Sequence, residues 1–234
     1  MRKLFLILLC IATLFSTKHE ASAKVNFGIK AGGNLSTIQL MGKTEIDING
    51  VTINKDNINM KPGFCIGMFI QDSEAEIITI ETGLNIETKG YKYDFDADIK
   101  VNGAKGNTKT SGNVNIVYAT IPVDLRINLR SLFLLVGPYC SVGIAGKANT
   151  YTESTVTVKR KTTTESNSIT KDLDFETDCK RVDAGIDLGI GFEPGEKLGI
   201  RFNYDMGLQN LLRDNDKKYS ATNRTYSVSV SYRL

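Results

Sequence analysis

The sequence RVDAGIDLGIGFEPGEKLGIRFNYDMGL, residues 181–208, alternates apolar and polar residues in two runs on either side of a Pro-Gly turn. A period of two predicts two strands, each with one apolar and one polar face. The polar faces mix charges with glycines, and repeated glycine inside a strand indicates crowding or sharp curvature. A small closed barrel with lipid outside and charges packed inside requires this combination.

The same alternation recurs in six other segments, which brings the predicted number of strands to eight. These segments are residues 25–32, 63–71, 76–101, 113–127, 132–145 and 224–234. In residues 76–101 the apolar residues change parity at Gly90, which we interpret as a bulge beyond which the strand continues above the membrane. Residues 132–145 are apolar on both faces, but the small and polar residues from Gly137 to Gly143 suit a packed interior.

The connections between the predicted strands alternate between long and short. Long polar segments occupy residues 35–62, 146–178 and 209–223, and short turns occupy residues 72–75, 129–131 and 194–197. Residues 102–112 join the strand that continues past Gly90 to the strand that returns at residue 113. Asn49-Gly50 predicts a two-residue hairpin inside the first long segment, and alternation at residues 155–158 and 169–175 predicts a protruding hairpin. The fold class is therefore all-β, an eight-stranded antiparallel up-and-down transmembrane barrel with long extracellular loops and both chain ends in the periplasm.

The first 23 residues have the order of a secretory signal peptide. Arg2 and Lys3 precede an apolar run of residues 4–15 and an Ala-Ser-Ala motif at residues 21–23. The run is shorter than the ~20 apolar residues of a membrane-spanning helix. The chain has 29 Lys and Arg and 26 Asp and Glu; this segment holds three and one of them, so its removal leaves a net charge of +1. That balance does not support nucleic-acid binding, and residues 24–234 fit one barrel domain.

Three cysteines remain after the signal peptide: Cys65, Cys140 and Cys179. An odd number with wide spacing is not a disulfide framework, and no Cys-x-x-Cys pair offers a metal site. Cys65 and Cys179 fall near the outer ends of strands that lie far apart around an eight-stranded barrel, which favours free thiols over a bond between them. Cys140 has the lipid-facing parity, where a cysteine behaves as a small hydrophobic residue.

Several short motifs, in order along the mature chain, resemble PorT-like outer-membrane β-barrel proteins. They are FGIKAGGNLS at residues 27–36, YATIP at 118–122, LLVGPY at 134–139, DAGIDLGIG at 183–191 and YDMGL at 204–208. The resemblance implies an eight-stranded barrel in a Gram-negative outer membrane. One branch of the family assists protein secretion, but most members have no assigned activity, so that role is not carried over. Family members often have a glutamate where this chain has Thr120, and no role of that glutamate is carried over either.

Eleven charged residues on the polar faces are predicted to point into the barrel. They are Lys30, Glu81, Glu87, Asp124, Arg126, Arg181, Asp183, Asp187, Arg201, Asp205 and Arg233. Such residues could form an ion path or a binding site. The alternative, which we favour, is a salt-bridged plug, because side chains fill the interior of an eight-stranded barrel and buried charges of both signs should pair.

The sequence gives little support to a calcium site or to catalysis. Asp94, Asp96 and Asp98 resemble the start of a calcium loop, but the sixth position lacks Gly and the twelfth lacks Glu. We predict that these aspartates form one solvated face of a protruding strand. The one histidine, His19, leaves with the signal peptide, and catalysis needs a positioned base or an activated nucleophile. We therefore predict no enzyme activity, no cofactor and no metal site.

The protruding hairpins and the last strand are the candidate interaction elements. Strand edges above the membrane can pair with extended segments of a protein partner, which would suit adhesion or secretion-complex assembly; passive shielding of the rim is the alternative. We expect the last strand to be an insertion signal for the barrel-assembly machinery, carried by Tyr226, Val228, Val230, Tyr232 and Leu234. Candidate anchors at the lipid interface are Phe64, Tyr204 and Tyr226.

These predictions together describe an integral outer-membrane barrel, surrounded by lipid, with a plugged lumen and a structural or interaction role. Two alternatives remain. One is a small channel, and the other is a secreted lipocalin-like barrel with its apolar face inward around a ligand. Alternation alone does not say which face points outward.

Overall fold

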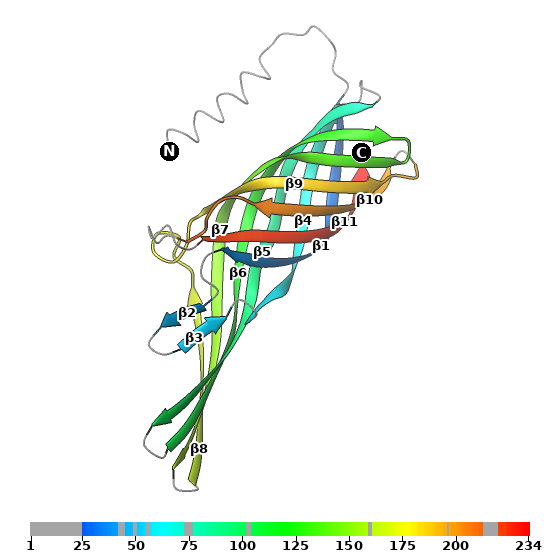
Figure 1. Ribbon diagram of the computed structural model, residues 1–234. Coiled ribbons are helices and arrows are strands. Elements are labelled where there is room, and N and C mark those ends of the chain that lie inside the picture. The colour runs from blue at the N-terminus through cyan, green and yellow to red at the C-terminus, as the bar shows by residue number, and fades with distance from the viewer. Residues whose placement is uncertain are drawn as a thin grey trace.

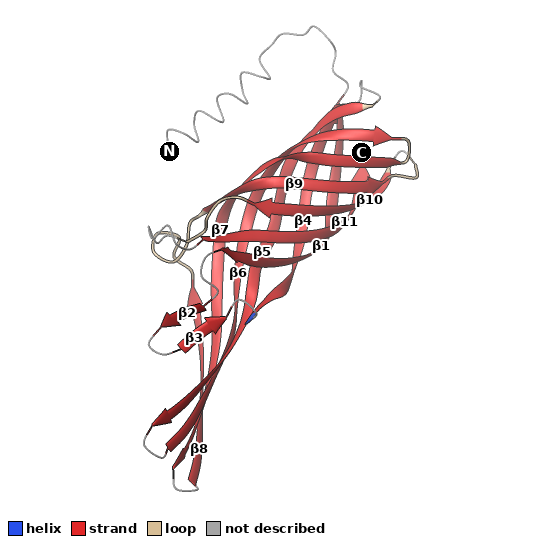
Figure 2. Ribbon diagram, in the orientation of Figure 1, coloured by secondary structure: helices blue, strands red, loops and turns tan. Residues whose placement is uncertain are grey.

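The computed structural model describes residues 25–41, 45–48, 51–54, 57–72, 77–101, 104–158, 161–195, 197–212 and 220–234. The predicted signal peptide at residues 1–23 lies outside this set. None of the described residues belongs to a helix long and apolar enough to cross a membrane. The described chain is almost entirely strand (Figure 2).

Eight antiparallel strands close into a barrel. They are β1 (Val25–Met41), β4 (Ile58–Asp72), β5 (Ile78–Val101), β6 (Ala104–Leu129), β7 (Leu132–Val158), β9 (Val182–Phe192), β10 (Leu198–Gly207) and β11 (Ser220–Arg233). Around the barrel the strands follow the order β6-β5-β4-β1-β11-β10-β9-β7, and pairing of β6 with β7 closes the ring. The predicted eight-stranded antiparallel barrel is confirmed, with every predicted strand present.

Three of the barrel strands extend far beyond the barrel as a narrow sheet (Figure 1). β5 and β6 stay paired as far as Val101 and Ala104, and β7 pairs with β9 over residues 132–142 but with β8 (Lys161–Asp172) over residues 147–158. We call residues 94–112 and 147–172 the arm; its sheet order is β5-β6-β7-β8. A small hairpin of β2 (Glu45–Ile48) and β3 (Val51–Asn54) pairs Ile48 with Val51, as the Asn49-Gly50 motif predicts.

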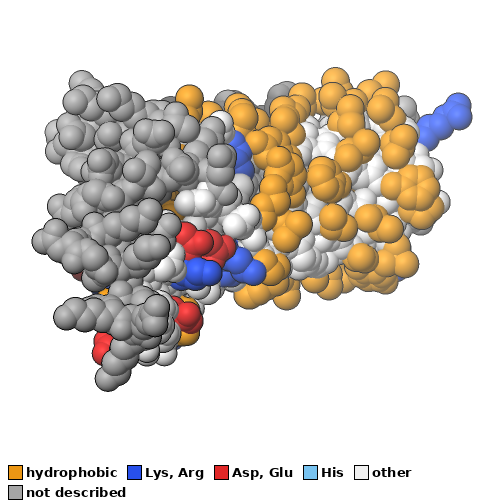
Figure 3. Space-filling view, turned by 60° about the horizontal axis from the view of Figure 1, so that its bottom comes forward, with side chains coloured by type: hydrophobic (Ala, Val, Ile, Leu, Met, Phe, Trp, Pro, Cys, Tyr) orange, Lys and Arg blue, Asp and Glu red, His pale blue; other side chains and the backbone are white. Residues whose placement is uncertain are grey.

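The apolar faces of the strands point outward. Along β1 the outward positions run from Val25 to Leu35, and they include Phe27 and Ile29, each about half exposed. Ten residue steps of about 3.3 Å, tilted by about 40°, rise about 25 Å, which is the height of the apolar band of an outer-membrane barrel. Figure 3 shows hydrophobic side chains spread over the barrel on one face of the molecule. This orientation is the reverse of the one that the lipocalin-like alternative requires.

The bulge that we predicted at Gly90 lies on the neighbouring strand instead. Gly90 pairs with Asn115 in an unbroken β5–β6 register. The β4–β5 register shifts between Met60 and Cys65, where β4 has one residue more than β5. That stretch contains Pro62, which has no N–H to donate to a ladder. The odd-numbered residues of β5 stay on one face throughout, so the change of parity at Gly90 is a change in which face is apolar.

The outward position of Val230 supports a test of the membrane orientation. Val230 is 55% exposed and pairs with Ala31, near the middle of the apolar band. We expect Val230→Arg to lower the free energy of unfolding from lipid bilayers by about 2–4 kcal/mol, because a cation at mid-bilayer depth loses its hydration. Val230→Leu should change it little. Urea titration of both variants in liposomes measures the difference, and equal stabilities would contradict an apolar band in contact with lipid.

Candidate functional site

The barrel interior collects most of the charged residues that were predicted to point inward. Seven of them are buried: Glu81, Glu87, Asp124, Arg126, Asp183, Asp187 and Arg201. Lys30, Asp205 and Arg233 are half-buried. Arg181 differs, because β9 begins one residue later and leaves this side chain exposed, with its guanidinium 5.1 Å from the centroid of the Phe175 ring. The alternation that suggested an inward position therefore extended one residue beyond the strand.

Near the short-turn end of the barrel, two glutamates join three arginines. We call Glu81, Arg126, Glu193, Arg201 and Arg233 the arginine cluster. Glu81 accepts a hydrogen bond from a guanidinium nitrogen of Arg126 at 3.1 Å, and it also forms a salt bridge with Arg201. Glu193 Oε2 lies 2.7 Å from Arg126 and 2.6 Å from Arg233. Two carboxylates thus bridge three guanidinium groups inside the barrel.

Aromatic rings hold the arginines from the side. The guanidinium of Arg126 lies 3.6 Å from the centroid of Phe133, and that of Arg201 lies 4.1 Å from the centroid of Phe69. The ring of Phe133 covers Gly191 so closely that a Cβ there would be 1.9 Å from a ring carbon. Glycine on the polar face therefore leaves room for an aromatic ring, which stacks on a cation in turn.

A second group of charges, which we call the lysine cluster, surrounds Lys89 nearer the arm. Lys89 Nζ lies 2.8 Å from Asp205, 3.2 Å from Glu87 and 3.8 Å from Asp183. It also lies 4.4 Å from the centroid of the Tyr139 ring. Lys89 was not among the predicted inward-facing charges, although it has the same parity as Glu81 and Glu87 and precedes the bulge predicted at Gly90.

Two bridges cross the lumen between strands on opposite sides of the ring. β5 and β10 are four strands apart in either direction around the barrel. The Glu81–Arg201 contact and the Lys89–Asp205 contact both join β5 to β10. Because a bridge of this kind passes through the middle of the barrel, the two clusters tie the opposite walls together.

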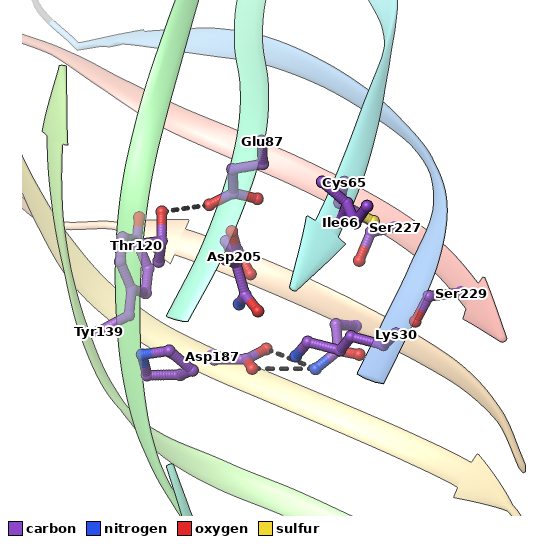
Figure 4. A pocket seen from close by; sticks show the side chains of 13 residues that line it. Lys30, Cys65, Ile66, Glu87, Thr120, Tyr139, Asp187, Asp205, Ser227 and Ser229 are labelled. Atoms are coloured by element: carbon purple, nitrogen blue, oxygen red, sulfur yellow. Dashed lines mark hydrogen bonds between the residues drawn. The ribbon is translucent and has the colours of Figure 1, made fainter. Parts of the chain in front are cut away.

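A small polar cavity lies among these charges (Figure 4). Its volume is about 30 Å³, enough for only a few water molecules. Asp187 faces it and accepts two hydrogen bonds from Asn203 Nδ2, at 2.9 and 3.1 Å. Thr120, which also lines it, donates a hydrogen bond to the carboxylate of Glu87 on the neighbouring strand. Thr120 of β6 thus binds a carboxylate from β5.

An apolar cap covers the arm end of the interior. Ile116, Tyr118 and Phe175 are buried together, and Val114, Leu173 and Cys179 pack against them. Phe175 comes from the segment between β8 and β9. It ends the alternating residues 169–175 that predicted a protruding hairpin, and its burial in this cap was not predicted. None of the three cysteines in the described chain forms a disulfide.

The remaining predicted residues lie on the outside. Asp94 and Asp96 are exposed on the arm, and the side chain of Asp98 is outside the described set. Within the described ranges no group of three or more His, Cys, Asp or Glu side chains is arranged to hold a metal ion. The residues of the predicted insertion signal all point outward, and the Tyr226 ring stacks on Tyr204 with centroids 4.8 Å apart.

The lysine cluster supports a test of what holds the interior together. We expect Lys89→Met to lower the free energy of unfolding by about 3–5 kcal/mol, because it leaves buried carboxylates without a cation. Lys92→Met, on the exposed face of the same strand, is the matched control and should have little effect. Denaturant titration measures both. A loss no larger for Lys89→Met than for the control would show that the cluster does not stabilise the barrel.

Comparison with known proteins agrees with this architecture. No curated protein matches the chain. The solved structures that resemble it include Ail, the attachment invasion locus protein of Yersinia pestis, at 11% identity and a TM-score of 0.37, covering 90% of this chain and 99% of that one. OprG of Pseudomonas aeruginosa has 11% identity and a TM-score of 0.36, with coverages of 91% and 97%. A family model described as outer membrane protein beta-barrel domain matches residues 15–213. The chain therefore belongs to this family of Gram-negative outer-membrane β-barrel proteins.

Proposed function

We propose that this protein is a closed outer-membrane barrel whose arm is an interaction surface outside the cell, used in adhesion or in the assembly of a secretion apparatus. The observation that carries the proposal is that β5, β6 and β7 each continue as one strand from the barrel wall into the arm, with a single register shift between β6 and β7 at Val117 and Tyr118. Polar loops that only shielded the rim would not need a four-stranded sheet. A PorT-like assignment within the family is part of the proposal.

The order of the arm supports an interaction role. Where β5 enters the arm, Tyr91, Tyr93 and Phe95 form a row, with successive ring centroids 6.3 and 5.3 Å apart. The hydroxyl of Tyr93 lies 2.6 Å from that of Thr150, two strands away. These contacts fix the sheet before any partner arrives. A preorganised surface loses less conformational entropy on binding than a flexible loop.

The filled interior supports a closed barrel rather than a pore. The arginine and lysine clusters bridge β5 to β10 across the lumen, and the apolar cap covers the arm end. A passing ion would have to separate these buried pairs, and the polar cavity of about 30 Å³ among them is too small for a hydrated path.

The connection lengths support one direction of the barrel in the membrane. The turns after β4, β6 and β9 are short, and Gly28 near the start of β1 pairs with Arg233 at that same end. Outer-membrane barrels keep short turns in the periplasm and long connections outside. We therefore place both chain ends in the periplasm and the arm outside, with β11 as the signal read by the barrel-assembly machinery.

Labelling of single cysteines tests the direction. Ser166 is exposed on β8 in the arm, and Gly195 is exposed in the short turn before β10, where a Cβ would contact nothing within 4 Å. We expect a membrane-impermeant maleimide to label Ser166→Cys on intact cells, above the level of the wild-type cysteines. Gly195→Cys should be labelled only after lysis. The opposite pattern would place the arm in the periplasm.

Conductance in planar bilayers tests the closed lumen. The purified wild-type barrel should give no steady single-channel steps. The double variant Glu81→Ala/Arg201→Ala removes one cross-lumen bridge and leaves the net charge unchanged, so it should conduct. A difference in gel mobility between unheated and boiled samples shows that the variant still forms a folded barrel. Open-channel steps of the wild-type protein would favour the small-channel alternative.

A further inference from the structure

The outer edge of β8 is a long strand edge that is paired with nothing in the described chain. β8 pairs with β7 over residues 161–172 and stands at the end of the sheet order. Residues 164–172 are exposed, and Figure 1 shows β8 at the far end of the arm. A row of unpaired N–H and C=O groups of this kind is a template for another strand.

The charges on this edge are arranged symmetrically. Glu165 and Lys171 lie three positions on either side of Ser168, and the five residues between them, SNSIT, are uncharged. Because the two charged residues are six positions apart, their side chains point to the same face of the sheet. The edge therefore has opposite charges at equal distances from its centre.

Such an edge is complementary to itself when two copies meet antiparallel about Ser168. In that register Glu165 of each copy stands opposite Lys171 of the other, which makes two cross-strand ion pairs. A shift of two residues in either direction would place Glu165 opposite Ile169 or Leu173 and lose both pairs. A shift of one residue would put the two charges on opposite faces.

We propose that the partner of this edge is β8 of a second copy, paired antiparallel about Ser168 between two cells. β8 runs from the tip of the arm toward the barrel in every copy. Two copies in one membrane therefore carry β8 in the same direction, and an antiparallel pair requires copies in two facing membranes. This inference rests on the proposed function, which places the arm outside the cell.

The side chains of the pair are available. Glu165 is exposed, and the side chain of Lys171 is 62% exposed while it donates to both oxygens of Asp178 at 2.8 and 2.9 Å. These hydrogen bonds lower the pKa of the Asp178 carboxyl. A lysine ammonium has three donors, so Lys171 can keep this contact while it meets a glutamate of the other copy.

The attachment between cells would come from many weak pairs. An exposed ion pair and one short strand pairing are weak alone, but many copies on two facing surfaces bind together at a high effective concentration. Because salt screens exposed charges, cell clumping should decrease as ionic strength rises.

Charge-reversal variants, expressed separately and then mixed, test the proposal in a Gram-negative host whose cells do not clump by themselves. Cells carrying the wild-type protein should settle from a standing culture. Cells carrying Glu165→Lys alone should stay dispersed, because each cross-strand pair would then place two lysines opposite each other. Cells carrying Lys171→Glu alone should stay dispersed for the same reason with two glutamates. A one-to-one mixture of the two variants should settle again, with contacts between unlike cells in two-colour microscopy.

The mixture distinguishes pairing between copies from damage within one chain, because mixing cannot restore the Lys171–Asp178 contact inside either variant. Glu176→Lys, an exposed charge reversal outside the edge, is the control and should settle like the wild type. Settling of either single-reversal culture, a mixture that stays dispersed, or wild-type cells that never settle would overturn the proposal. Labelling of Ser166→Cys on intact cells distinguishes failure of the self-pairing from failure of the proposed function. A labelled arm on cells that do not settle overturns only the self-pairing. An unlabelled arm overturns the proposed function as well.

Discussion

The contact between Glu81 and Arg201 is the interaction on which the rest of the barrel depends most. It joins β5 to β10 through the middle of the lumen, and Arg126 shares the same carboxylate. In lipid the strands can turn only their apolar faces outward, so a charge on the inner faces is costly unless it has a counter-charge inside. A bridge across the lumen satisfies this electrostatic requirement and fills the space at the same time.

The glycines of the polar faces belong to the same arrangement. Gly191 leaves room for the ring of Phe133, and the ring supports the guanidinium of Arg126. A larger residue at position 191 would displace the ring and loosen the packing of the charged core around it. The combination of glycine, charge and alternation in residues 181–208 is thus the sequence pattern of an interior in which aromatic rings and ion pairs share a narrow space.

Alternation predicted the barrel strands because the lipid-facing side of each strand must be apolar, which produces a sequence period of two. The same pattern did not predict strands that have no lipid-facing side. The arm is solvated on both faces, so most of residues 104–112 and 161–172 looked like loop. Lys89 could have been predicted from its parity with Glu81 and Glu87, because the bulge predicted at Gly90 would come after it. The burial of Phe175 was missed because alternation placed it at the end of a protruding hairpin, and packing against distant strands leaves no local pattern.

The continuity of β5, β6 and β7 has a mechanical consequence. The ladder hydrogen bonds of antiparallel strands lie across the strand direction. A pull on the tip of the arm would therefore act along the strands and load many of these bonds together in shear, rather than open them one after another from an end. The same force would reach the bridges between β5 and β10, so that the charged interior would act as an anchor for the arm under tension.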